Sequence, residues 1–141
     1  NLVAEEPSPI RQFTFNFFTP TTFATQGTHL PFPIPALMFR SWLQRWNHFA
    51  PIYLGGDELI TYLTQAIKVK RHRLQTRNFQ LYRGFMTGFT GEVTLQLPFR
   101  SDPILAHVSN LLANYAIFCG TGVKTRLGMG QSSLLNILHL R

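Results

Sequence analysis

The order in which the hydrophobic period changes along the chain is the feature that most limits its fold. Phenylalanines alternate with polar residues from Gln12 onward, which predicts a half-buried strand that ends before Thr19-Pro20. The period becomes helical after Pro35, with inward positions predicted at Phe39, Trp42, Leu43, Trp46 and Phe49. A shorter helix is predicted to begin at Asp57, with inward positions at Leu59, Ile60, Leu63 and Ile67.

A basic segment opens the second half of the chain. It predicts a hairpin whose strands are residues 68–74 and 77–83, with the turn at Gln75-Thr76. A glycine-rich stretch then leads to an alternating strand at residues 92–97. Three strands, the two of the hairpin and the one at residues 92–97, are therefore expected before the next helix.

The remaining elements are a long helix and a final strand. Asp102 as the cap and Pro103 in the first turn predict a helix that ends at Gly120. Its predicted inward stripe consists of Ile104, Val108, Leu111, Leu112, Tyr115 and Phe118. The last strand, apolar on both faces, is predicted over residues 133–140.

Together these elements follow the order β-α-β-β-α-β, with the basic hairpin as an insertion. This order predicts an α+β, ferredoxin-like domain, in which two helices cover one face of a four-stranded antiparallel sheet and the other face stays free. RNA-recognition modules share that architecture, but the segment Arg83-Gly84-Phe85-Met86 departs from their signature at Met86. The ordinary RNA-recognition motif is therefore disfavoured.

Composition supports one packed domain. The chain has 141 residues, of which 45% are apolar and 13% are charged. This length and apolar content are sufficient for a buried hydrophobic core. We assign the domain to residues 11–141 and interpret residues 1–10 as a linker or a remnant of a longer chain. Cys119 has no disulfide partner, so we expect a small buried hydrophobe in a reducing compartment. No stretch has the length of a membrane span, so we expect a cytoplasmic protein without a membrane partner.

Positive charge is concentrated in one run. The chain carries 13 Lys and Arg residues against 6 Asp and Glu residues, for a net charge of +7, which favours polyanionic partners. Five cations and no acid lie between residues 68 and 77, namely Lys68, Lys70, Arg71, Arg73 and Arg77. They could protect an exposed edge from aggregation. We favour a track for a phosphate backbone, beside which Phe79 or Tyr82 could stack a base.

A second candidate site is the loop from Gly120 to Gly130, in which two Gly-x-Gly units flank five residues. Glycines permit a backbone with positive φ, while the two cations of the loop can bind phosphate. A dinucleotide fingerprint would need glycine at Thr125, and a phosphate-binding P-loop would need glycine at Val123. The remaining alternative is a glycine-rich connection needed only for a tight turn.

The loop and its flanking segments carry a family resemblance. The loop, the segments 111–119 and 88–93, the opening segment 13–23 and the helix with two tryptophans resemble the C-terminal half of the CRISPR repeat-RNA-processing endoribonucleases. These enzymes belong to the repeat-associated mysterious protein superfamily. The resemblance covers nearly the whole chain.

The resemblance implies two ferredoxin-like domains in tandem and cleavage of repeat RNA without metal or other cofactor. The 2′-hydroxyl attacks the adjacent phosphate, and the catalytic His belongs to an N-terminal domain that this sequence lacks. The isolated chain is thus expected to be inactive. Its implied role is to position RNA through Gly120, Gly122, Lys124, Thr125, Arg126, Gly128 and Gly130.

The implied partners are CRISPR repeat RNA and the chain's own N-terminal domain. The alternative is a non-catalytic RNA-binding or structural subunit of a CRISPR interference complex, because related proteins share the fold and the loop. An upstream domain with a His near its first helix would favour the nuclease.

The histidines give only a weak catalytic candidate. His29, His48, His107 and His139 show no partner at catalytic or ligand spacing. His72 lies among the hairpin cations and is the one that could act as an acid or base. No group of His, Cys or carboxylates has metal-site spacing, so no metal is expected.

Overall fold

A four-stranded antiparallel sheet forms the centre of the fold. The computed structural model describes residues 11–98 and 103–135. The sheet order is β4-β5-β1-β6, formed by β4 (Lys68–Gln80), β5 (Phe85–Gln96), β1 (Gln12–Thr21) and β6 (Ser132–Leu134). All three neighbouring pairs are antiparallel. This is the strand order of a ferredoxin-like domain, and it confirms the predicted α+β fold.

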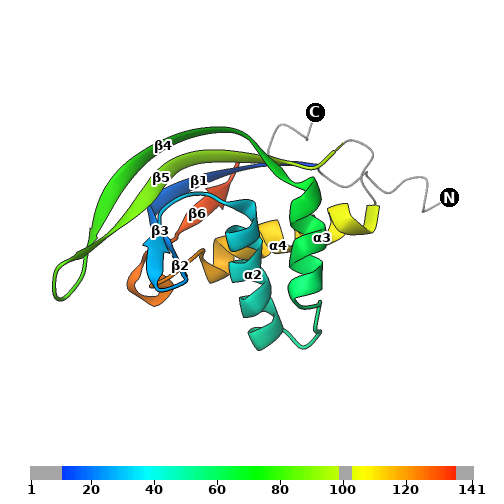
Figure 1. Cartoon of the computed structure of the whole chain (residues 1–141), viewed down its shortest axis with the longest axis horizontal. Coiled ribbons are helices and arrows are strands. Elements are labelled where there is room, and N and C mark those ends of the chain that lie inside the picture. The colour runs from blue at the N-terminus through cyan, green and yellow to red at the C-terminus, as the bar shows by residue number, and fades with distance from the viewer. Residues whose placement is uncertain (1–10, 99–102, 136–141) are drawn as a thin grey trace.

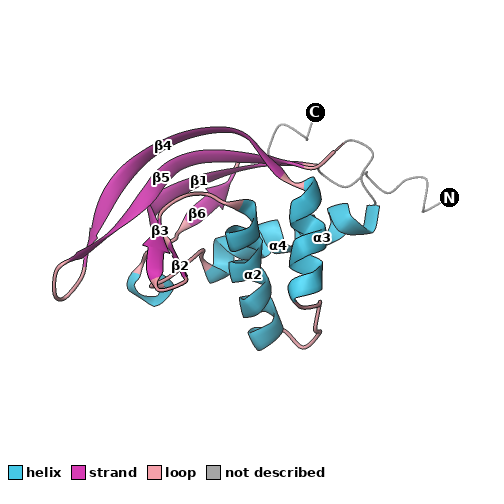
Figure 2. Ribbon diagram, viewed as in Figure 1, coloured by secondary structure: helices cyan, strands magenta, loops and turns pink. Residues whose placement is uncertain are grey.

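Three helices pack beneath the arched sheet (Figure 1). They are α2 (Pro35–Phe49), α3 (Asp57–Ala66) and α4 (Pro103–Cys119). The two crossover helices α2 and α4 begin and end close to their predicted limits, as does the short α3. The helices lie on one side of the sheet and none of the described helices covers the other side, as Figure 2 also shows.

The core lies between the four-stranded sheet and the three helices. Phe13, Phe15 and Phe17 are each about 1% exposed or less, which confirms the alternation predicted for the first strand. The ring of Phe15 lies 5.3 Å from that of Trp42 between centroids. The strand continues to Thr21, past the predicted end, through an irregularity that accommodates Pro20.

A small second sheet was not predicted. It consists of β2 (Phe23–Thr25) and β3 (Thr28–Leu30), joined by a turn in which Gln26 and Gly27 have positive φ. The Thr- and Gly-rich composition of this region had indicated only a loop. His29 consequently lies on a strand, where it is exposed.

The basic segment does not form an inserted hairpin, and its predicted turn was placed wrongly: residues 68–80 are the single strand β4, which pairs with β5 within the four-stranded sheet. Gln75 and Thr76 pair with Thr90 and Phe89 within the ladder, so β4 passes straight through the predicted turn. The chain reverses at residues 81–84, where Gly84 has a φ of 84°. All five predicted cations therefore lie on a single strand.

The partner strand also begins earlier than predicted. β5 starts at Phe85 and includes two of the glycines that had been interpreted as a connection. A Cβ on Gly91 would lie 2.1 Å from the Arg73 carbonyl oxygen, so this glycine permits the close approach of the two strands.

The inward face of α4 was predicted wrongly. Ile104 and Phe118 are 71% and 82% exposed, and Leu111 is also exposed. The buried residues are Leu105, Ala106, Ser109, Leu112, Ala113 and Ala116. Small side chains face the core because they let the helix lie close to its neighbours, and the larger apolar residues are left outside. Of the predicted stripe, only Leu112 is fully buried.

Some predictions lie outside the described residues. These are the linker at 1–10, the cap at Asp102, and the end of the last strand with His139. The described part of that strand is β6, which pairs with β1 from Ser132 to Leu134. No described helix has the length and apolar character needed to span a membrane.

Candidate nucleic-acid interface

The glycine loop connects α4 to β6 in a conformation that requires its glycines. Gly120, Gly122, Gly128 and Gly130 all have positive φ, between 72° and 106°. Lys124 also has positive φ, at 59°, and precedes the single turn of 3-10 helix η1 (Thr125–Leu127). The loop thus reverses direction several times within eleven residues.

Close backbone contacts explain two of the glycines. A Cβ on Gly122 would lie 2.1 Å from the Thr22 carbonyl oxygen, and one on Gly130 would lie 2.0 Å from the Thr121 carbonyl oxygen. Because both obstacles are main-chain atoms, no side chain fits at either position without moving the backbone. These glycines therefore have a structural role in the folded chain itself.

Backbone hydrogen bonds hold the loop against the end of β1. The Gly130 N–H donates to the Pro20 oxygen over 2.9 Å, and the Val123 N–H donates to the Thr22 oxygen over 3.0 Å. Within the loop, the Thr121 N–H donates to the Gly130 oxygen over 3.0 Å. The two Gly-x-Gly units are thus linked to each other and to the central strand.

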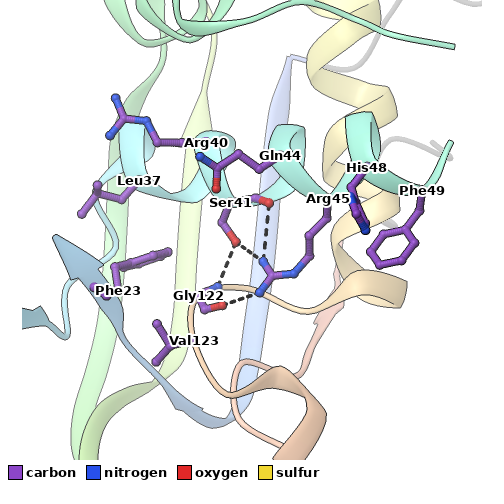
Figure 3. A pocket seen from close by; sticks show the side chains of 11 residues that line it. Phe23, Leu37, Arg40, Ser41, Gln44, Arg45, His48, Phe49, Gly122 and Val123 are labelled. Carbon is purple, nitrogen blue, oxygen red and sulfur yellow. Dashed lines mark hydrogen bonds between the residues drawn. The ribbon is translucent and has the colours of Figure 1, made fainter.

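Helix α2 fixes the loop from the other side (Figure 3). The Arg45 guanidinium donates to the Gly122 oxygen over 2.6 Å, and the Gly122 N–H donates to the Ser41 hydroxyl over 3.0 Å. Arg45 also donates to the Ser41 hydroxyl. The Trp42 indole donates to the Thr121 hydroxyl over 2.8 Å. Both polar groups of Gly122 are therefore bonded to α2.

Sequence reasoning missed the roles of Ser41 and Arg45. They precede Gly122 by 81 and 77 residues, so no local pattern connects them with the loop. Trp42 was predicted as a core residue, and it is fully buried. The hydrogen bond from its indole N–H to Thr121 could not be predicted from the sequence.

The cations of the loop point outward. Lys124 and Arg126 are exposed, whereas Thr125 between them is half-buried. Thr125 packs against the start of the loop, since a Cβ on Gly120 would lie 2.7 Å from its Cγ2 atom. The loop therefore presents two positive charges on a fixed backbone.

The five predicted cations of β4 are all exposed. Arg71 pairs with Thr94 and Arg73 pairs with Glu92, and cross-strand neighbours share a face. Because the neighbouring Val93 is buried on the helix side, the two arginines lie on the free face of the sheet. Lys70 sits at an irregularity in the ladder and donates to the Gln12 side-chain oxygen over 2.9 Å.

The far part of β4 meets the glycine loop. A Cβ on Gly128 would lie 3.6 Å from the Cζ atom of Phe79. Arg77, two residues before Phe79, shares a groove with Asn16 and Thr90 on the free face. The two cationic segments, predicted separately from the sequence, are thus adjacent in the fold.

The weak catalytic candidate His72 stays exposed on β4. It pairs with Val93 and shares a shallow groove with Arg71, Arg73, Glu92 and Thr94. Within residues 11–98 and 103–135, no three His, Cys, Asp or Glu side chains gather where they could hold a metal ion.

Cys119 lies at the root of the loop and is half-buried rather than fully buried. Its thiol donates to the Gly120 oxygen over 3.2 Å. Burial raises the pKa of this thiol from its ordinary value of 9.0 to about 11, against a smaller lowering by the Arg45 guanidinium. The thiol is therefore protonated at neutral pH.

The fold and the site define a ferredoxin-like domain that carries a cationic surface beside an ordered glycine loop. The family model described as CRISPR-associated endoribonuclease Cas6 matches residues 15–132. The chain belongs to this family, which confirms the resemblance noted in the sequence.

Individual relatives agree with the assignment. A CRISPR-associated endoribonuclease Cas6 from Streptococcus thermophilus is 31% identical over 123 residues, which cover 86% of this chain and 50% of that protein. One from Mycobacterium tuberculosis is 28% identical and covers 85% of this chain and 38% of its own length.

Solved structures show the same fold. A Thermus thermophilus Cas6 matches with a TM-score of 0.80 and 32% identity, covering 95% of this chain and 57% of that one. A Cas6 product complex also gives a TM-score of 0.80, with 29% identity over 92% of this chain and 53% of that one. The chain spans between 38% and 57% of the length of these four relatives.

Proposed function

We propose that this chain is the C-terminal, RNA-positioning half of a CRISPR endoribonuclease that processes precursor repeat RNA into guide RNAs. Family membership supports the reaction class. The chain matches only about half of the length of a relative, which supports a protein with a second domain. In the proposed reaction, the 2′-hydroxyl at the cleavage site attacks the adjacent phosphate and the 5′ oxygen of the next nucleotide leaves. The groups that move these protons belong to the preceding domain.

The observation that carries the proposal is the adjacency of two cationic segments. Phe79 on β4, two residues after Arg77, lies next to the loop that carries Lys124 and Arg126. A phosphate backbone that follows β4 along the free face would reach the loop without leaving positively charged surface. The proposed site therefore comprises Lys68, Lys70, Arg71, Arg73 and Arg77 together with the loop residues Gly120, Gly122, Lys124, Thr125, Arg126, Gly128 and Gly130.

The structure refines the proposed part played by the glycines. Gly122 and Gly130 are required by the chain's own backbone, so their contribution to binding is to shape the loop. Direct contact with phosphate is proposed for the exposed Lys124 and Arg126.

A titration of repeat RNA at several salt concentrations tests the proposal. We expect the isolated chain to bind with a log–log salt slope of roughly −0.7 for each neutralised phosphate of a single strand. The double variant Lys124→Ala, Arg126→Ala should lose about 1–3 kcal/mol of binding free energy and melt like the parent, because both side chains are exposed. Affinity that does not respond to salt would contradict the proposal.

Cleavage is tested with the same RNA in EDTA on a denaturing gel. We expect no cleavage by the isolated chain and specific cleavage by a longer protein that includes a preceding ferredoxin-like domain. Cleavage by the isolated chain that His72→Ala abolishes would show that the chemistry resides on β4. A longer protein that binds repeat RNA without cutting it would instead support the non-catalytic subunit of a CRISPR interference complex.

A further inference from the structure

A groove that the proposed RNA track does not include lies between α2, β2 and the glycine loop (Figure 3). Its volume is about 560 Å³. The lining residues are Phe23, Ala24, Leu37, Arg40, Ser41, Gln44, Arg45, His48, Phe49, Gly122 and Val123. They include two arginines and no acid.

One wall of the groove is polar. Arg40, Gln44 and His48 are spaced by four residues, so they lie along one face of α2, and all three are exposed. Within the described residues, the side chains of Arg40 and Gln44 take part in no hydrogen bond or ion pair. Their donors are therefore free for a ligand, unlike those of Arg45, which hold the loop.

The remainder of the groove is apolar and ends at an aromatic ring. Phe23 and Val123 line it opposite α2, and Phe49 closes one end with 69% of its surface exposed. The ring of Phe49 is braced edge-on by His48, at 4.5 Å between centroids and 90° between planes. Its remaining exposed surface is available for stacking.

The groove continues directly from the loop. Gly122 and Val123 belong to both, and the next residue, Lys124, is one of the two outward cations of the loop. An extended strand that crosses Lys124 would therefore arrive at the groove. The groove is too small for a duplex but has the size of a site for a small ligand, so an unpaired nucleotide fits its dimensions.

We propose that this groove binds an unpaired nucleotide of the RNA, adjacent to the segment held by the glycine loop. Arg40 pairs with its phosphate, Gln44 hydrogen-bonds the edge of its base, and Phe49 stacks on the base. The proposal rests on the proposed function, because the same strand must first occupy the loop. A cation, an amide and an exposed ring at one end of a phosphate track match the chemistry of a nucleotide.

A ladder of fluorescein-labelled oligouridines, lengthened one nucleotide at a time, tests the proposal. The affinity of the parent chain should rise at the length at which the strand enters the groove. Phe49→Leu should remove that rise, with a loss of about tenfold, and leave the affinity of shorter oligomers unchanged. Arg40→Gln should do the same and reduce the salt slope for the longer oligomers by about 0.7.

Tyr62→Leu is the matched control, because it removes an exposed aromatic ring from α3, which does not line the groove. It should retain the rise. A ladder that is identical for the parent, Phe49→Leu and Arg40→Gln would overturn the groove proposal and leave the proposed function standing. If the parent binds none of the oligomers and no repeat RNA, the proposed function fails as well.

Discussion

The glycine loop and strand β4 carry their positive charges in opposite ways. In the loop, two exposed cations sit on a backbone whose turns are fixed by four glycines and by hydrogen bonds to β1 and α2. On β4, five cations are spread along an edge strand that is bonded to β5 on one side only. The loop therefore holds two positive charges at fixed positions, whereas the strand carries five positive charges along its length.

This difference suggests a division of labour. An extended row of charge binds a phosphate backbone without fixing its register, whereas an ordered loop can select where along the strand a phosphate must lie. Substitutions of the loop glycines should therefore change the fold and the register of binding, and substitutions on β4 should change mainly affinity and its dependence on salt.

The largest expected effect is on stability, from adding a methyl group to the loop. Gly130→Ala places a Cβ 2.0 Å from the Thr121 carbonyl oxygen and should cost on the order of 3 kcal/mol. Gly84→Ala is the control at the β4–β5 turn. It has a similar φ of 84° but no atom within 4 Å of the added Cβ, so it should cost about 1 kcal/mol. Thermal melts measure both, and equal losses would mean that backbone approach in the loop is unimportant.

The next effect is on RNA affinity, from removing charge along the strand. Replacing Arg71, Arg73 and Arg77 by glutamine should reduce the log–log salt slope by about 2 and the binding free energy by about 1–3 kcal/mol. The melting temperature should change little, because all three side chains are exposed.

The lysine versions of the same three substitutions keep the charge and serve as the control. They should retain most of the salt slope, because a point charge still neutralises a phosphate. If the glutamine variant binds RNA like the parent, the cations of β4 do not bind RNA and serve only to protect an exposed edge strand from aggregation.

Features that depend on neighbouring residues could be predicted from the sequence, and features that depend on contacts between distant residues could not. The alternation of Phe13, Phe15 and Phe17 and the helical spacing around Trp42 are local patterns, and both predicted elements were confirmed. Phe49, which was predicted to face inward, is instead 69% exposed at the end of the helix. The β4 turn was misplaced because Gln75 and Thr76 look like turn residues but are held in the ladder by Thr90 and Phe89.

Predictions failed where the neighbouring elements determine which side chains are buried or hydrogen-bonded. The outward stripe of α4 contains larger side chains than its buried face, so size and hydrophobicity pointed the wrong way, and only the neighbouring elements select Ala106, Ala113 and Ala116 for the interior. The bonds from Ser41 and Arg45 to Gly122 likewise depend on how α2 lies against the loop.

A smaller effect is expected from loosening that contact. Arg45→Met leaves the Gly122 carbonyl without its charged donor and should cost about 1–2 kcal/mol of stability. Arg40→Met, on the same helix and exposed, is the control and should stay within about 0.5 kcal/mol of the parent. Chemical denaturation compares the two, and equal midpoints would show that α2 does not hold the loop.

The smallest effect is one of chemistry at the root of the loop, without a change in the fold. The Cys119 thiol has its pKa raised to about 11, because burial disfavours the thiolate, and only the thiolate reacts with a disulfide reagent. The folded chain should therefore react with Ellman's reagent at pH 8 far more slowly than the urea-unfolded chain. Since the folded state holds this proton more tightly, the resulting stability is complete below about pH 9 and is lost as the pH rises through about 11.

The same thiol can report on the loop in the variants. Cys119 donates to Gly120, so a variant that releases the loop should expose the sulfur and speed the reaction under conditions where the helices remain folded. Gly130→Ala should accelerate it, and the β4 glutamine variant should not. An equal acceleration by both would mean that the loop and the strand open together, and the contrast between an ordered site and an extended row of charge would then be wrong.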